Sequence, residues 1–315
     1  MSTPTVIRAP LHCDVAPALR DRLAVIGNMD GVHLGHQVLL DETVRLAGER
    51  PTAAIVFEPH PRRVFAPESA PFLLTDLTTK TEIISAHGID TIFVLPFIDD
   101  LYRQTPEKFV QQTLGQRLGL AGIVTGSDFQ FGKGRAGDVY ALKGLAEQMG
   151  MEAHAITPIL KDGGDKYSSS AIRQALREGR PEDAAQQLGR PFGIRGDVIE
   201  GRKLARNLGV PTANVALADY VRPLFGVYAI NVDIGDRHVP GIANVGIRPT
   251  VDGTAPLLEA HLFDFDGDLY GQTIRVDLLH FIRPEQKFDG LDALKAQISK
   301  DSGIARDWLS ENLGL

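Results

Sequence analysis

The sequence predicts two domains: an α/β doubly wound domain built on a parallel sheet, then a small antiparallel β-barrel domain with a C-terminal helix. Three observations carry this prediction. The chain of 315 residues exceeds the size of about 100–200 residues that is common for one domain. Residues 20–180 alternate short β-branched runs with longer segments of helical spacing, and beyond residue 190 short alternating segments take over. We place the domains at residues 1–185 and 186–315.

Composition narrows the class of protein. Hydrophobic residues make up 43% and charged residues 23%, typical of a globular protein with a sizeable core. The net charge of −7 argues against a nucleic-acid or anionic-membrane partner. The single cysteine, Cys13, excludes an internal disulfide and favours a reducing compartment. Because we find no signal-peptide core and no apolar run of about 20 residues, we expect a cytoplasmic protein.

In the first domain, strands and helices are predicted to alternate. The apolar runs cover residues 23–26, 53–57, 91–95, 122–125 and 154–156. The segments with helical spacing cover residues 37–47, 79–87, 106–118, 139–149 and 169–178. Such alternation predicts a parallel sheet covered by helices on both faces, with ligands beyond the carboxyl ends of its strands.

In the second domain, short strands are predicted to follow one another directly. They cover residues 193–199, 227–232, 238–245, 259–263 and 273–279, and a helix follows only at residues 291–298. Turn residues with a short helix at 179–192 join the two domains. This pattern predicts a small antiparallel barrel or sandwich.

A glycine- and histidine-rich segment, GNMDGVHLGH at residues 27–36, follows the first predicted strand and opens a helix. A helix N-terminus exposes unpaired backbone N–H groups and attracts phosphate. Gly31 and Gly35 allow a phosphate to approach the backbone closely, and His33 and His36 share one face. The segment therefore predicts a phosphate-binding helix start. The alternative is a pair of solvated histidines.

Three further polar loops follow predicted strands. In FEPHP, at residues 57–61, two prolines fix the backbone. In GSDFQFGKGRAGD, at residues 126–138, glycines, cations and aromatic rings suit a phosphate and a flat ring, although a flexible hairpin is the alternative. In SSSAIR, at residues 168–173, hydroxyls and an arginine start a helix, where they cap it or bind phosphate. We expect all these loops at one edge of the sheet.

The second domain carries a separate polar motif, PTAN at residues 211–214. If Thr212 and Asn214 lie on a strand, their oxygens project from the same side and suit Mg²⁺ together with phosphates. Glu259 begins an alternating segment and could act as the general base for an alcohol. The alternatives are an ordinary turn for the motif and an exposed strand carboxylate for Glu259.

The four loops of the first domain resemble the N-terminal, nucleotidyltransferase-like module of bacterial bifunctional riboflavin kinase/FAD synthetases. The second domain resembles the riboflavin kinase module of that family in PTAN and in three further segments: GVYA at 226–229, DLYG at 268–271 and FIRPEQKF at 281–288. The resemblance implies an enzyme that phosphorylates riboflavin to FMN with ATP and Mg²⁺. It then adenylylates FMN to FAD with ATP and releases pyrophosphate.

The resemblance also implies roles for individual residues. His33 and His36 would contact the ATP phosphates, and Arg173 would hold the pyrophosphate side. Glu259 would accept the proton of the ribityl hydroxyl, and the metal ligands would be Thr212 and Asn214. The other ATP- or flavin-binding residues would be Gly27, Asp30, Gly35, His60, Asp128, Phe129, Arg135, Ser169, Ser170, Gly201, Arg206 and Arg283.

Several positions depart from the family pattern. Met29 stands where phenylalanine is commonest, Gln130 where arginine is common, and Ser170 replaces threonine. Ala205 replaces a glycine and Val210 a phenylalanine. Gln130 and Ala205 leave open the alternative that only one activity is functional. Another alternative is a flavin- or nucleotide-binding regulator without catalysis. The sequence assigns no oligomeric state.

Overall fold

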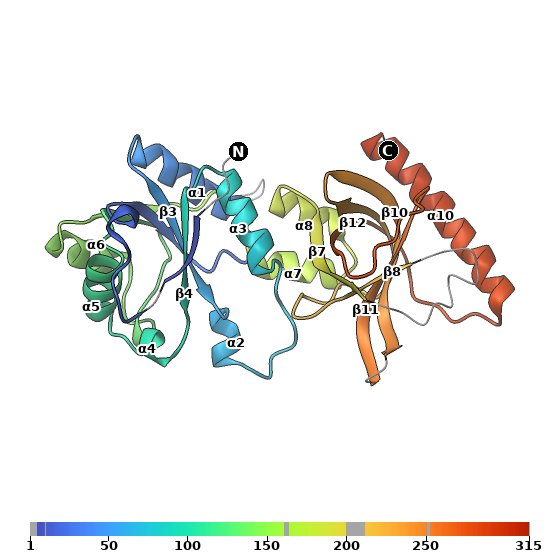
Figure 1. Cartoon of the computed structure of the whole chain (residues 1–315), viewed down its shortest axis with the longest axis horizontal. Helices are drawn as coiled ribbons and strands as arrows, with labels where there is room; N and C mark the ends of the chain where they lie inside the picture. The colour runs from blue at the N-terminus through green and yellow to red at the C-terminus, as the bar shows by residue number, and fades with distance from the viewer. Residues whose placement is uncertain (1–4, 10, 161–163, 200–211, 251–252, 315) are drawn as a thin grey trace. The chain divides into compact units, whose positions relative to one another are not determined.

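The computed structural model describes residues 5–9, 11–160, 164–199, 212–250 and 253–314 (Figure 1). Contacts divide the chain into two compact units. The first unit comprises Met1–Ser69 and Leu77–Tyr167, and the second comprises Ala70–Asp76 and Ser168–Leu315. The domain boundary at residue 185 stays a prediction, and we describe each unit by itself.

A six-stranded parallel sheet forms the centre of the first unit. Its order is β1-β4-β3-β2-β5-β6, and every neighbouring pair is parallel. The strands are β1 (Thr5–Arg8), β2 (Leu23–Ile26), β3 (Thr52–Glu58), β4 (Thr91–Pro96), β5 (Gly122–Gly126) and β6 (Glu152–Ile156). The predicted parallel α/β architecture is confirmed. The edge strand β1 was not predicted.

Helices cover both faces of this sheet, with α5 and α6 on one side of β4 and α3 on the other (Figure 1). The elements are η1 (Pro17–Leu19), α1 (Leu34–Ala47), α2 (Pro61–Phe65), α3 (Leu77–Ala86), α4 (Asp99–Tyr102), α5 (Pro106–Lys108), the π-helix η2 (Phe109–Arg117), η3 (Lys133–Arg135) and α6 (Val139–Gln148). Leu23 and Val25 of β2 share a core cluster with Leu40 of α1. Ala24 and Ile26 belong to another cluster, as alternation along a strand requires.

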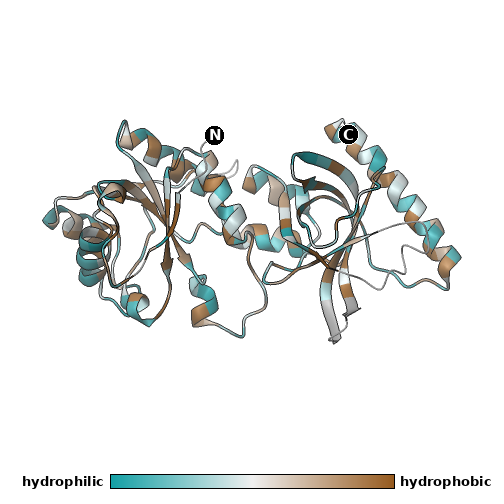
Figure 2. Ribbon diagram, viewed as in Figure 1, coloured by the Kyte–Doolittle hydropathy of each residue, from teal (hydrophilic) through white to brown (hydrophobic). Residues whose placement is uncertain are grey.

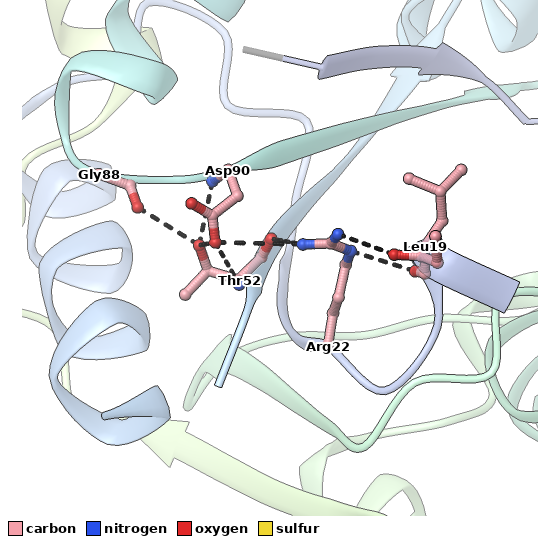
Figure 3. Close-up of polar contacts among 6 residues, drawn as sticks. Leu19, Arg22, Thr52, Gly88 and Asp90 are labelled. Carbon is pink, nitrogen blue, oxygen red and sulfur yellow. Dashed lines mark hydrogen bonds and ion pairs between the residues drawn. The ribbon is translucent and has the colours of Figure 1, made fainter. Parts of the chain in front are cut away.

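Three strands begin at a shared polar cluster (Figure 3). Arg22, just before β2, is 9% exposed. Its guanidinium donates to the carbonyl oxygens of Ala18, Leu19 and Thr52 at 3.2, 3.1 and 3.3 Å. The N–H of Thr52 donates to Oδ2 of Asp90 at 2.8 Å, and the N–H of Asp90 donates to Oγ1 of Thr52 at 3.1 Å. The cluster ties together the amino ends of β2, β3 and β4, and the polar loops follow their opposite, carboxyl ends.

A closed antiparallel barrel forms the centre of the second unit, in the order β10-β11-β8-β7-β12-β9. The strands are β7 (Phe192–Ile199), β8 (Ala213–Ala216), β9 (Gly226–Ile234), β10 (Arg237–Thr250), β11 (Gly253–Leu262) and β12 (Thr273–Pro284). The helices are α7 (Ser169–Arg177), α8 (Pro181–Leu188) and α10 (Leu291–Leu313). The predicted barrel and C-terminal helix are confirmed, and α10 extends well beyond the predicted residues 291–298.

Hydrophobic side chains concentrate inside both units. Figure 2 shows the hydrophobic colour along the central strands of the sheet and the hydrophilic colour over much of the helices. Inside the barrel, Val215, Tyr228 and Leu258 belong to one core cluster. Outside it, Ala305 and Leu309 of α10 pack with Val227 of β9. None of the helices in the described ranges is long and apolar enough to span a bilayer.

Candidate functional site

Two stacked histidines lie at the start of α1, directly after the loop that follows β2. His33 is the N-cap residue of α1 and only 7% exposed. Its ring stacks on that of His36, with ring centroids 3.7 Å apart and an interplanar angle of 17°. A Cβ atom at Gly35 would lie 3.2 Å from the Nδ1 and Cε1 atoms of His33. The predicted pair therefore forms one compact group at a positively polarised helix end.

Burial controls the charge of His36. Its Nδ1 atom is shielded from solvent and has no hydrogen-bond partner within the described part of the chain. Burial, the charge of His33 and the charge of Lys80 together hold the pKa of His36 well below 6.5. An adjacent anionic phosphate acts in the opposite direction and favours the imidazolium. The ring can therefore take up a proton when a polyphosphate binds.

The loop before α1 has an unusual backbone. Met29, Gly31 and Val32 all have positive φ angles, of 46°, 86° and 40°. A β-branched residue such as Val32 seldom adopts this conformation, and such strain gathers at functional loops. Met29 is 1% exposed and belongs to the core cluster beside β2. Its replacement of the usual phenylalanine is therefore a change in core packing.

In the barrel, three polar residues lie in one row across neighbouring strands, and a fourth, Glu285 just after β12, contacts this row. Asn214 of β8 pairs in register with Glu259 of β11, which pairs in register with Asn244 of β10. Their strand neighbours, such as Val215 and Leu258, point into the core, so the row faces outward. The Nδ2 of Asn244 donates to Oε1 of Glu285 at 3.2 Å. The row places amide oxygens beside carboxylates, an arrangement suited to a divalent cation and a proton acceptor.

Comparison with known proteins assigns both parts of the chain to one family. A family model described as FAD synthetase matches residues 16–171, and one described as riboflavin kinase matches residues 188–309. The bifunctional riboflavin kinase/FMN adenylyltransferase of Escherichia coli K12 is 41% identical over 286 residues, which cover 90% of this chain and 91% of that protein. The chain belongs to the bifunctional riboflavin kinase/FMN adenylyltransferase family. It is an enzyme with both catalytic domains of that family.

Other relatives agree over nearly the whole length. The protein of the same description from Pseudomonas fluorescens is 41% identical over 299 residues, which cover 94% of this chain and 95% of that protein. A crystal structure described as a macrolide-efflux protein from Streptococcus pneumoniae is 29% identical, with a TM-score of 0.84. The match covers 98% of this chain and 100% of the chain in that crystal structure. The two-unit architecture is therefore shared with a solved structure.

The remaining residues predicted around the adenylyltransferase site occupy several loops. His60 caps α2, since its Nδ1 accepts from the N–H of Arg62 at 3.0 Å. Asp128 accepts from Nζ of Lys166 at 3.2 Å. The ring of Phe129 stacks on that of Phe131, with centroids 5.6 Å apart. Three more predicted positions belong to the same loops: Gly27 after β2, Asp30 with 2% exposure, and the exposed Arg135 in η3.

Helix α7 carries the predicted residues Ser169, Ser170 and Arg173. Ser168 caps this helix by accepting from the N–H of Ala171 at 3.2 Å. Ser169 is half-buried and Ser170 is exposed. Arg173 is 7% exposed, and its Nε donates to the carbonyl oxygen of Phe72 at 2.7 Å. All these residues belong by contacts to the second unit, and the role of Arg173 at pyrophosphate stays a prediction.

Several residues predicted to act in the kinase domain lie near the ends of its strands. Arg283, predicted to border flavin, forms a partly buried ion pair with Asp301 of α10 at 2.7 Å. Gln297 donates to the same carboxylate at 2.8 Å, so the group fastens α10 to β12. Thr212 lies half-buried just before β8. The predicted residues Gly201 and Arg206, with the departures Ala205 and Val210, lie outside the described residues.

Sequence reasoning missed an exposed aromatic group beyond β3 and β4. Phe65 of α2 is 66% exposed, and its ring contacts Phe97 and Tyr102, with centroids 5.6 and 5.3 Å away. Phe57 packs edge-on against Phe97 at 5.6 Å. The sequence did carry a signal for this group, since aromatic residues stand at or after the ends of two neighbouring strands. We refer to Phe57, Phe65, Phe97 and Tyr102 as the aromatic group.

Proposed function

We propose that this chain makes FAD in two steps, as a cytoplasmic enzyme whose partners are riboflavin, FMN and ATP. The barrel unit phosphorylates riboflavin to FMN, and the sheet unit adenylylates FMN to FAD. The observation that carries the proposal is the presence of two separate, chemically different sites in one chain. One is the histidine pair at α1, and the other is the outward row of Asn214 and Glu259. The net charge of −7 argues against a nucleic-acid partner.

In the adenylyl transfer, a phosphate oxygen of FMN attacks the α-phosphorus of ATP. A new P–O bond forms, and the bond from the α-phosphorus to the bridging oxygen of pyrophosphate breaks. No covalent enzyme intermediate is needed, so the protein acts by positioning and charge stabilisation. The backbone N–H groups at the start of α1, with His33 and His36, would stabilise charge on the phosphates.

The aromatic group offers a place for the flavin ring of FMN. Three of its rings, Phe65, Phe97 and Tyr102, are at least partly exposed, and such rings at the carboxyl edge of a parallel sheet are typical of a surface that stacks a flat ligand. Phe65 is too exposed to be a core residue. Because this group follows β3 and β4 while the histidines follow β2, we place FMN on the β3–β4 side and ATP on the β2 side.

In the kinase reaction, Glu259 would accept the proton of the ribityl hydroxyl as its oxygen attacks the γ-phosphorus of ATP. The bond to the β-phosphate oxygen breaks and ADP leaves. Thr212 and Asn214 would hold Mg²⁺, since their neutral oxygens suit this hard cation beside phosphates. The ion supplies charge neutralisation of the phosphates when bound. Asn214 is 5% exposed, so its amide is largely shielded from solvent.

Purified protein incubated with riboflavin, ATP and Mg²⁺ should yield FMN and then FAD, measured by chromatography. We expect His33→Ala to lower FAD formation from supplied FMN by about 10²-fold or more, because a charge-stabilising donor is lost. FMN formation should stay unchanged in that variant. Glu259→Ala should do the reverse, with a loss of about 10²-fold in FMN formation.

The outcomes separate the alternatives. Appearance of FMN without FAD in the wild type would show that only the kinase is functional. Tight flavin binding with no turnover would identify a regulator and contradict the proposal. Chelation of Mg²⁺ should stop product formation, and activity that persists without any divalent cation would contradict the metal assignment.

A further inference from the structure

A cavity in the sheet unit lies outside both proposed sites. It measures about 470 Å³, within the range of about 300–1,000 Å³ that is usual for small-molecule sites. Its lining comes from residues 11–12 after β1, from α4 with the turn that follows it, and from the helical segment formed by α5 and η2. None of the lining residues belongs to the histidine pair or to the aromatic group. The cavity is therefore a separate feature of this unit.

The π-helical form of η2 brings two distant cations to the same side of the helix. Lys108 ends α5, and Arg117 ends η2 nine residues further along. In an α-helix of about 3.6 residues per turn, side chains nine residues apart lie on opposite sides. A π-helix closes its hydrogen bonds over five residues, as from the N–H of Leu118 to the oxygen of Thr113 at 3.1 Å, so each turn takes more residues. Nine residues then make about two full turns, and both side chains line the cavity.

The carboxylates that line the cavity already have partners. Oδ2 of Asp99 lies 2.8 Å from a guanidinium nitrogen of Arg103, and the hydroxyl of Tyr102 donates to the same carboxylate. Oδ2 of Asp100 lies 3.1 Å from Nε2 of His12. These contacts occupy both acids of the lining, together with one of its three lysine and arginine side chains.

The other two cations of the lining have no such partner. Neither Lys108 nor Arg117 forms a side-chain ion pair with any residue in the described ranges. Between them in sequence, Gln112 and Thr113 add an amide and a hydroxyl group to the lining. Thr113 and Gln104 are 4% and 8% exposed, and Oγ1 of Thr113 donates to Oε1 of Gln104 at 2.9 Å. The cavity therefore combines two available positive charges with a buried, hydrogen-bonded polar wall.

We propose that this cavity binds a small organic anion with at least two carboxylate or phosphate groups, held by Lys108 and Arg117. Two cations at two positions of one helix suit two negative groups of a single ligand. The guanidinium of arginine binds a carboxylate or a phosphate through paired N–H donors, and the ammonium of lysine acts as a point charge. The amide of Gln112 supplies a further donor. The inference is independent of the reaction assigned to the histidine pair.

The polar lining also limits the class of ligand. Sites for flat or apolar molecules are lined mainly by hydrophobic and aromatic side chains, whereas nine of the ten residues that line this cavity are polar or charged. The net charge of the whole chain is −7, so an excess of one positive charge in the lining, three cations against two carboxylates, makes the cavity a local attractor for anions. A hydrophilic anion therefore fits this site better than a flavin ring does.

Calorimetric titration of the full chain tests the proposal, with citrate as the carboxylate probe and pyrophosphate as the phosphate probe. The test variant combines Lys108→Gln with Arg117→Gln. The matched control combines Lys143→Gln with Arg45→Gln, which removes the same charge at exposed positions of α6 and α1. We expect the test variant to bind at least one probe about tenfold more weakly or worse, because charge-assisted hydrogen bonds are lost. The control should keep the affinity of the wild type.

The two probes distinguish the sources of the anion. Citrate binding that the test variant loses supports a carboxylate ligand, and pyrophosphate binding that it loses supports a phosphate ligand. Pyrophosphate can also bind at the histidine pair, so only the part of its binding that the test variant loses reports on the cavity. Lys108→Gln alone changes an exposed position and should already weaken binding, even if the loss of Arg117 disturbs η2.

Three results would overturn the inference. They are no binding of either probe to the wild type, unchanged binding in the test variant, and an equal loss of binding in the control. Since no turnover is measured, failure of the chain to make FAD would overturn the proposed function and leave this result unaffected.

Discussion

Gly35 is the residue on which the stacking of the two histidines depends. A Cβ atom there would lie 3.2 Å from two atoms of the His33 ring and 3.5 Å from Cβ of Tyr167. Gly35→Ala should therefore displace the His33 ring by a few tenths of an ångström, although alanine suits a helix better than glycine. We expect kcat/KM for FAD formation to fall by about tenfold or more, with the rate of FMN formation unchanged.

A matched control exists for this substitution. Gly144 of α6 has open space around its missing Cβ, so Gly144→Ala should keep both activities and add slightly to stability. FAD formation at the wild-type rate in Gly35→Ala would show that the stacked arrangement is not needed. Both rates come from one assay with riboflavin or FMN supplied.

At the residue scale, the sequence predicts the chemical role of a side chain better than it predicts the burial and the neighbours of that side chain. The segment at residues 27–36 identified His33 and His36, because glycine and histidine at a helix start have a direct chemical meaning. The burial of Lys80, which is 2% exposed, could not be predicted in this way, since a lysine in a helical segment is usually solvated. Its burial depends on the packing of α3 against the rest of the unit. The packing role of Met29 became visible for the same reason only in the structure.

At the element scale, the outer face of β12 carries a buried carboxylate. Asp277 is 8% exposed, and its Oδ1 lies 2.9 Å from a guanidinium nitrogen of Arg275. Burial raises the pKa of Asp277 to about 6, because it outweighs the attraction of Arg275. Burial and the charge of Arg275 in turn lower the pKa of Arg190 to about 10. Asp233 of β9 adds a second negative charge that raises the pKa of Asp277.

Asp277 should make the barrel unit less stable as pH rises. The folded pKa of about 6 lies above the unfolded value of about 3.9, so the folded state binds the proton more tightly. Its contribution is present below about pH 4 and is lost as pH rises to about 6. In Asp277→Asn this loss disappears. The difference in the free energy of unfolding between Asp277→Asn and the wild type should therefore increase by about 2–3 kcal/mol in favour of the variant between pH 4 and pH 7.

Urea unfolding of both proteins across this pH range measures the difference. Asp266→Asn changes an exposed loop position and should follow the wild type at every pH. A constant difference between Asp277→Asn and wild type from pH 4 to 7 would contradict the assignment of a raised pKa.

Strands and helices with a clear hydrophobic pattern could be predicted from the sequence. Those that form only because they pair or pack with other elements could not. The buried strands β2 to β5 consist of apolar runs, which the sequence shows directly. Strand β1 has four residues, most of them exposed, and exists by pairing with β4. Helix α10 continues through Ser302 and Gly303, residues that lower helix propensity. Its packing on the barrel through Ala305 and Leu309 outweighs that preference.

At the scale of the whole molecule, the chain forms two units with separate cores. One short segment lies within the sequence of the first unit and belongs by its contacts to the second. Ala70–Asp76 belongs by contacts to the barrel unit. The N–H groups of Phe72 and Leu73 donate to the carbonyl oxygen of Asp219 at 3.0 and 2.9 Å. Leu74 is 1% exposed within the same core cluster as Val221. By contacts, the barrel unit therefore comprises two separate stretches of the chain.

This arrangement predicts that a residue early in the chain controls the stability of the later unit. Leu74→Ala should cost about 2–5 kcal/mol, as for other buried leucines, and the loss should fall on the barrel unit. Riboflavin kinase activity should then be lost at a lower temperature, while FAD formation from supplied FMN resists heating as in the wild type. Leu40→Ala, buried in the core beside β2, should do the reverse. Heat inactivation of each activity reports on the unfolding of the unit that carries it. If Leu74→Ala instead lowers the inactivation temperature of FAD formation more than that of FMN formation, the segment supports the sheet unit and the prediction is wrong.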